Sequence, residues 1–170
     1  MSLDSLHDLF VEELKDLHSA ERQIIRALPR MAKAAESPEL RMAFERHLAE
    51  TEKQLERLDR IFAELEKKGT GKKCVGMEGL IEEGKEMMQE EAEPAVMDAA
   101  LIAAAQRVEH YEIAAYGCVR NYAQLLGYTQ AAKLLQQTLD EEEATDKKLS
   151  ELAEGGINEA AVAAGAAAEE

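Results

Sequence analysis

Glutamates at helix positions that should be apolar are the residues of this sequence best able to carry chemistry. The segment 107–117 reads R-V-E-H-Y-E-I-A-A-Y-G, and its apolar residues recur at helical spacing. Glu112 falls on that apolar stripe between Val108 and Ala115, and Glu109 lies one turn earlier. A carboxylate on the buried face of a helix requires a compensating partner, because an isolated charge is very unfavourable in a protein interior.

Three other segments with helical spacing repeat this feature. Glu21 interrupts one apolar stripe, and Glu142 interrupts another, with Asp146 one turn beyond it. Glu50 lies at the margin of a fourth stripe, one turn after His47. The candidate metal ligands are therefore Glu21, His47, Glu50, Glu109, Glu112, Glu142 and Asp146.

The heights of these acids along their helices agree. Glu21 lies 16 residues before the turn signal at Ser37, and Glu50 lies 13 residues after it. Two further glutamates lie 15 residues before and 15 residues after the turn signal at Gly127. With a rise of about 1.5 Å per residue, each helical hairpin brings its two acids to one level near mid-helix. We therefore expect one central cluster of carboxylates.

Either most of these buried carboxylates are protonated, or cations compensate their charge. Two divalent or trivalent cations can be bridged and chelated by carboxylates in a helical bundle. Oxygen ligands with one or two imidazoles suit iron or manganese better than structural zinc. For each glutamate taken singly, a solvated face is the alternative, and Glu141 and Glu143 are expected there. For His47 the alternative to ligation is a buried histidine beside the ligands. Tyr111, Tyr116 and Tyr122 are expected to pack, with one of them able to hydrogen-bond a ligand.

The elements that must position these residues are four long amphipathic helices. They are expected over residues 3–35, 38–68, 94–127 and 129–155, and no run has the alternation of a strand. Ser37 and Pro38 signal the start of the second helix, Pro94 opens the third, and Thr129 is expected to cap the fourth.

Connection lengths discriminate between bundle topologies. The first and last helix pairs are joined by a few residues and should be antiparallel hairpins. The glycine-punctuated stretch 69–93 separates the middle helices and contains a weak helical piece over residues 80–91. About 14 extended residues span a helix of about 45 Å, so this stretch can return the chain along the bundle. We predict an all-α four-helix bundle with one long crossover over residues 1–156, and a frayed or marginally helical Ala-rich tail over 157–170.

Composition narrows the class of function. The chain has 170 residues, 46% of them hydrophobic, and a net charge of -15. This charge argues against nucleic acid and anionic membranes as partners and suits a protein that gathers cations. No apolar run resembles a signal peptide or a membrane span, so we expect a cytoplasmic location. Cys74 and Cys118 form neither a disulfide framework nor a zinc motif and are expected to be free thiols.

Five stretches between residues 3 and 155 carry a family resemblance: H-S-A-E-R-Q, H-L-A-E-T-E-K-Q-L-E-R-L, K-C-V-G-M-E-G-L, A-Q-R-V-E-H-Y-E-I-A-A-Y-G and L-D-E-E-E-A-T-D-K-K-L-S-E-L-A. They resemble the YciE/YciF family of bacterial stress-associated proteins, which is similar in fold to rubrerythrin and ferritin. The resemblance implies a homodimer of ferritin-like bundles, each with a di-iron site of two iron ions; manganese is the alternative metal.

The wider di-iron group uses one Glu on the first helix, Glu-x-x-His on the second and fourth, and one or two Glu on the third. Glu21, the Glu109/Glu112 pair and Glu142 match this pattern. Thr145 stands where the last histidine would be, and on the second helix Lys53 takes the histidine position while a histidine precedes the glutamate.

Two classes of function follow. The first is reduction of peroxide or oxygen at a carboxylate-bridged dimetal centre, with a manganese catalase as a variant. The second is a bundle without turnover that binds metal or a partner protein. Metal content and peroxide turnover distinguish these classes.

Overall fold

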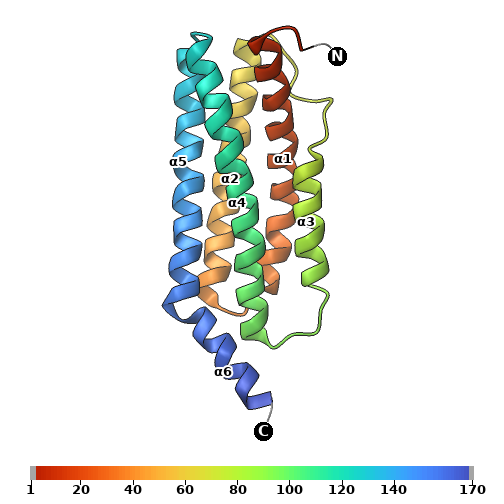
Figure 1. The fold of residues 1–170 in the computed structure, drawn as a ribbon, viewed down its shortest axis with the longest axis vertical. Coiled ribbons are helices and arrows are strands. Elements are labelled where there is room, and N and C mark those ends of the chain that lie inside the picture. Colours follow the sequence, from red (N-terminus) through yellow and green to blue (C-terminus); the bar gives the residue numbers. More distant parts are fainter. Residues whose placement is uncertain (1–2, 169–170) are drawn as a thin grey trace.

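The computed structural model describes residues 3–168 and forms a four-helix bundle with one long crossover (Figure 1). All regular elements in this part of the chain are helical. The predicted architecture is therefore confirmed. None of the helices within residues 3–168 is long and apolar enough to cross a membrane. The bundle helices are α1 (Leu6–Ala34), α2 (Pro38–Glu64), α4 (Pro94–Leu125) and α5 (Thr129–Leu152).

The predicted turn signals define the two hairpins. The Ser37 side chain accepts a hydrogen bond from the backbone N–H of Leu40, and Pro38 occupies the first turn of α2. Between α4 and α5 the backbone of Gly127 adopts φ +78°, which favours glycine. The prediction for the start of α5 was wrong by one residue. Thr129 is its first residue and Tyr128 is the cap.

The crossover contains the short helix α3 (Val75–Met87), which begins earlier than the predicted piece at 80–91. It starts after Cys74 because the Cys74 sulfur accepts a hydrogen bond from the backbone N–H of Met77. The helix packs on α1 and α4 along the outside of the bundle (Figure 1). Both cysteines are free thiols, as predicted; Cys74 is buried and Cys118 is exposed.

The core consists of two apolar clusters with a polar layer between them. On α1, Leu17 belongs to one cluster and Ile24 to the other. On α5, Leu139 and Leu149 divide in the same way. On each of these two helices a buried glutamate, Glu21 or Glu142, lies between the two apolar residues. The acids therefore occupy one level of the bundle, near mid-helix.

Of the two alternatives expected for the Ala-rich tail, frayed or marginally helical, the structure has the helical one over the residues it describes. A turn of π-helix over Ala153–Ile157, with Gly156 at φ +139°, redirects the backbone. The helix α6 (Asn158–Ala168) follows and packs against α4 (Figure 1). The boundary at residue 156 lies within this turn.

Candidate metal centre

Four buried side chains from three helices converge at the centre of the bundle. Each of His47, Glu109, Glu112 and Glu142 offers a ligand atom, and these atoms all lie within 4.8 Å of one another. Their helices are α2, α4 and α5. The His47 Nε2 and Glu109 Oε1 atoms are 3.2 Å apart. A single cation can therefore contact several of these side chains at once.

Glu21 brings the fourth bundle helix, α1, to the same centre. Its side chain is fully buried and is electrostatically coupled to the carboxylates of Glu142 and Glu112. The hydroxyl of Tyr116, also fully buried, donates a hydrogen bond to Oε1 of Glu21. Of the three tyrosines expected to pack, with one of them able to hydrogen-bond a ligand, Tyr116 is the one that bonds Glu21.

Unpartnered polar atoms concentrate in this centre. Among the described residues, ten buried side-chain nitrogen and oxygen atoms have no hydrogen-bond partner, and eight belong to these five side chains. Burial without a partner costs about 1–3 kcal/mol for a polar group and more for a charge. Proteins tolerate such a set where an ion supplies the missing partner. The eight atoms are Glu21 Oε2, both ring nitrogens of His47, Glu109 Oε2, and both carboxylate oxygens of Glu112 and Glu142.

Burial dominates the electrostatics of the cluster. It raises the pKa of Glu21, Glu109 and Glu112 well above the ordinary value of 4.5, and nearby carboxylates raise these values further. The Tyr116 hydrogen bond opposes the shift at Glu21. Burial lowers the pKa of His47, which favours the neutral imidazole that metals bind. Without cations the centre therefore holds protons, and a bound cation would displace them.

Two predicted ligands, Glu50 and Asp146, lie outside the buried centre formed by the group of four and Glu21. Glu50 is partly exposed, and its Oε1 accepts a hydrogen bond of 3.0 Å from Arg46 Nε. Asp146 accepts a hydrogen bond from Gln106 and lies 3.3 Å from Nε2 of the exposed His110. Both acids sit at the margins of their stripes, where a charged or polar neighbour holds them.

A partly buried ion pair on the α2–α5 side of the bundle was missed from the sequence. Arg57 binds both oxygens of Glu141, at 2.6 Å and 2.7 Å, and donates to Thr138 Oγ1 at 3.1 Å. The expectation of a solvated Glu141 was therefore wrong, because its side chain is only 26% exposed. The missed signal was an arginine one residue before Leu58, on the buried side of α2.

Comparisons with known proteins agree with this fold. The family model described as "Domain of unknown function (DUF892)" matches residues 5–162. Protein YciF of Escherichia coli (strain K12) is 49% identical over 162 residues, which cover 95% of this chain and 98% of YciF. The chain belongs to the DUF892, or YciF, family. The family resemblance read from the five sequence stretches is thereby confirmed.

Solved structures of similar proteins have the same fold. The crystal structure of the E. coli stress protein YciF matches with a TM-score of 0.88 at 49% identity, over 92% of this chain and 99% of that one. YcfI from Rhodopseudomonas palustris matches with a TM-score of 0.84 at 42% identity, over 88% and 97%. A protein from Xanthomonas campestris pv. campestris, at 22% identity and a TM-score of 0.71 over 93% and 94%, shares the fold.

Proposed function

We propose that this protein binds two metal ions at the centre of its bundle and reduces peroxide or oxygen there. Glu21, His47, Glu109, Glu112 and Glu142 would hold the ions, with iron as the first candidate and manganese as the second. The observation that carries the proposal is the group of eight buried polar atoms without a hydrogen-bond partner among the described residues. Glu50 and Asp146 lie beside this group, and we assign them at most a supporting role in metal binding.

The donor set fits these metals. It consists of four carboxylates and one imidazole, and oxygen-rich sites with a few nitrogen ligands suit iron and manganese. Buried carboxylates and an imidazole drawn together from four helices are also the arrangement that dimetal sites use in helical bundles. Two divalent cations would offset the four negative charges that the carboxylates acquire when they ionise.

The chain's own residues contribute exclusion of water and control of protons. A pair of iron or manganese ions, when bound, supplies electrons in pairs to a peroxide or to dioxygen. The apolar clusters on either side of the centre shield it from water along the bundle axis. Tyr116 holds a proton at Oε1 of Glu21, and burial raises the pKa of this phenol, so the hydroxyl remains a donor. Removal of oxidants would also suit a homologue of a protein described as a stress protein.

A bundle that binds metal without turnover is the second candidate. One histidine is present among the four clustered ligands, and Thr145 stands at the position where the wider di-iron group has another. A ligand set poorer in imidazole suits tight cation binding as well as it suits redox cycling. Peroxide consumption by the loaded protein separates the two candidates.

The test is an anaerobic titration of the metal-free protein with Fe(II) and Mn(II). We expect two ions per chain, and loss of at least one in Glu112→Ala. The control is Glu143→Ala, which removes an exposed acid from α5. Equal metal content in both variants would reject the site. Two bound ions that reduce no peroxide, even with an added electron donor, would reject the enzyme and leave the second candidate.

A further inference from the structure

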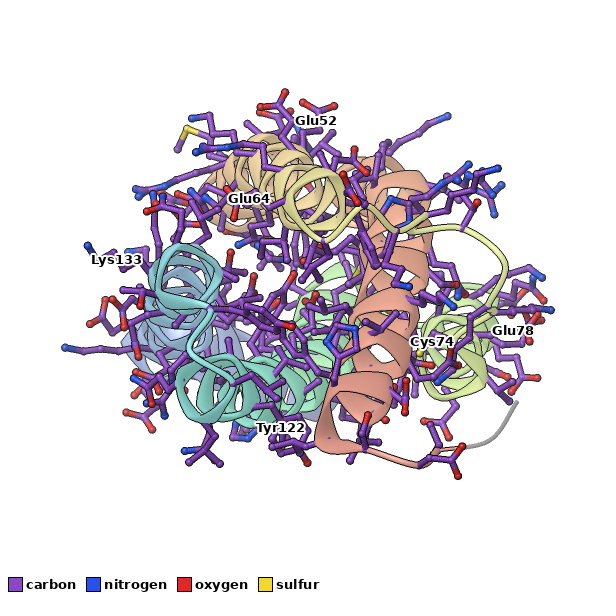
Figure 2. All side chains as sticks on the ribbon, turned by 90° about the horizontal axis from the view of Figure 1, so that it is seen from above. Glu52, Glu64, Cys74, Glu78, Tyr122 and Lys133 are labelled. Atoms are coloured by element: carbon purple, nitrogen blue, oxygen red, sulfur yellow. The ribbon has the colours of Figure 1, made fainter. Side chains whose placement is uncertain are left out.

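A cavity of about 300 Å³ connects the surface of the bundle with the candidate metal centre. It lies between α1, α3 and α4, and its lining includes His47 and Glu109. The crossover helix α3 forms its outer wall, since α3 packs on both α1 and α4. Figure 2 shows α3 outside α1, with Cys74 between the two helices and Glu78 facing outward. The volume is at the lower end of the range for ligand pockets.

The walls of this cavity are apolar. Aliphatic and thioether side chains of α1 and of the crossover face each other across the cavity and line it. Such walls favour an apolar ligand body, and methionine side chains adapt to its shape. The principal wall residues are Ile24, Leu28 and Met31 on α1, and Leu80, Ile81 and Met88 on the crossover.

Two arginines bring uncompensated positive charge to the rim. Arg26 and Arg30 lie four residues apart on α1, are exposed, and line the cavity. Neither takes part in an ion pair among residues 3–168. The two acids of the rim, Glu78 and Glu82, are paired with Lys73 and Lys85. This rim is therefore locally positive on a chain whose net charge is -15.

The opposite face of the metal centre differs in charge. A second cavity of about 560 Å³ between α2, α4 and α5 also includes His47 and Glu109 in its lining. Its charged lining is mainly acidic, and Arg46, one of its two bases, is paired with Glu50. An anion would therefore be repelled on that face and attracted at the first cavity. Of its acids, Glu50 pairs with Arg46 and Glu141 with Arg57, whereas Glu39 and Asp140 have no ion-pair partner among residues 3–168.

We propose that the cavity between α1, α3 and α4 binds an amphipathic anion of the class of medium-chain carboxylic acids. The carboxylate pairs with Arg26 and Arg30 at the rim, and the alkyl chain extends inward toward His47 and Glu109. One part of this inference rests on the proposed function, namely that the bound acid is the organic part of a substrate of the metal centre. Binding itself requires the cavity and its two arginines.

Isothermal titration of the full-length protein with decanoate tests this proposal, in both the metal-free and the metal-loaded form. We expect binding to tighten by about fourfold per methylene from hexanoate to decanoate, since each buried methylene adds to the transfer free energy. Decyltrimethylammonium, which has the same chain and the opposite charge, should bind at least tenfold more weakly, because the rim repels it.

Variants locate the site. Arg26→Gln combined with Arg30→Gln should weaken decanoate binding by about tenfold, as expected for charge-assisted contacts at a solvated rim. The matched control is Arg22→Gln combined with Arg60→Gln, which removes the same charge from exposed positions outside the cavity lining. Ala27→Leu, which narrows the cavity, should also weaken binding, and its circular dichroism and Tm would show whether it folds.

Three outcomes would overturn the proposal: equal binding of the cationic probe, equal loss in the control pair, or unchanged binding in the rim variant. Failure of the metal proposal is distinguishable from these. It would appear as absent ions in the metal titration while decanoate still binds the metal-free protein.

Discussion

At Glu21 two opposing effects meet on one carboxyl group. Burial and the charge of Glu142 raise its pKa, whereas the hydrogen bond from Tyr116 lowers it. Tyr116 therefore favours the ionised form that a metal requires, although it contributes no ligand atom itself. Tyr116 lies on α4, one turn beyond Glu112. One helix therefore supplies both a candidate ligand and the hydroxyl that favours the ionised form of a second candidate ligand, Glu21.

The Tyr116→Phe variant tests this pairing. We expect metal affinity to fall by about tenfold, because residues that hydrogen-bond a metal ligand commonly have effects of this size. The loss should be larger at pH 6 than at pH 8, since a more basic Glu21 competes for protons at the lower pH. Mn(II) titrations at the two pH values measure it, with Tyr122→Phe as the control. An equal loss in both variants would assign the effect to packing.

The ion pair between Arg57 and Glu141 gives a second prediction. Arg57→Met should lower the free energy of unfolding by about 2 kcal/mol at pH 7, because it removes two charge-assisted hydrogen bonds from a half-buried acid. Arg57 holds the pKa of Glu141 below its ordinary 4.5 against the opposing effect of burial. The stabilisation is therefore present above pH 4.5 and is lost as the pH falls through the lowered pKa.

Urea unfolding of the Arg57→Met variant and the parent at pH 7 and pH 3.5 measures this difference. Arg60→Met, at an exposed position of α2, is the control. A difference that stays constant as the pH falls would show that the arginine acts through its apolar stem and not through its charge.

At the scale of elements, the crossover helix is fixed by close approach to α4. A Cβ atom on Gly76 would lie 2.8 Å from Cε2 of Tyr111, so no side chain fits there without displacing the ring. The Tyr111 hydroxyl donates to Asp16 at 2.7 Å and lies 3.0 Å from the sulfur of Cys74. The Tyr111 ring thus links α3, α1 and α4, and it fits there because Gly76 has no side chain.

Gly76→Ala and Gly79→Ala form a matched pair within α3. Gly76→Ala should destabilise the protein by about 1–3 kcal/mol, the usual cost of overpacking. A Cβ atom on Gly79 meets nothing within 4 Å, so Gly79→Ala should stabilise α3 by up to about 1 kcal/mol through helix propensity. Thermal or urea unfolding gives both values. The same sign for both variants would contradict the assigned packing.

Sequence periodicity predicted the helices and the level of the acids well, because rise and turn per residue are fixed by the backbone. Periodicity did not predict which way the side chains at the margins of the apolar stripes point. Glu50 and Asp146 could turn toward the centre or away from it, and Arg46 and Gln106 decide their direction in the folded chain. Partners from other helices cannot be read from periodicity. The Arg57–Glu141 pair was missed for this reason, and periodicity did not say which of the three tyrosines would hydrogen-bond a ligand.

At the scale of the whole molecule, the polar layer makes stability depend on cations and pH. The folded metal-free chain keeps Glu21, Glu109 and Glu112 protonated above pH 4.5, where the unfolded chain ionises them. Rising pH therefore favours unfolding through these groups. Bound cations reverse this effect, and they stabilise by about 2.7 kcal/mol at a hundredfold excess over Kd.

We therefore expect the Tm gap between metal-loaded and chelator-treated protein to widen as the pH rises from 5.5 to 7.5. Groups remote from the centre titrate alike in the metal-loaded and metal-free forms, so their effects on Tm cancel when the two Tm values are subtracted. Differential scanning calorimetry with Mn(II) or with a chelator measures it. A gap that is absent or independent of pH would argue against metal in the layer. The homodimer implied by the family resemblance remains a prediction, which native mass spectrometry would test.

The burial of Cys74 under α3 gives the protein an internal reporter of its own motion. A thiol reagent can reach this sulfur when the crossover detaches from α1, whereas the exposed Cys118 reacts at all times. The ratio of the two alkylation rates therefore measures how often α3 lifts from the bundle. Gly76→Ala should raise that ratio severalfold, and a ligand that bridges α1 and α3 should lower it.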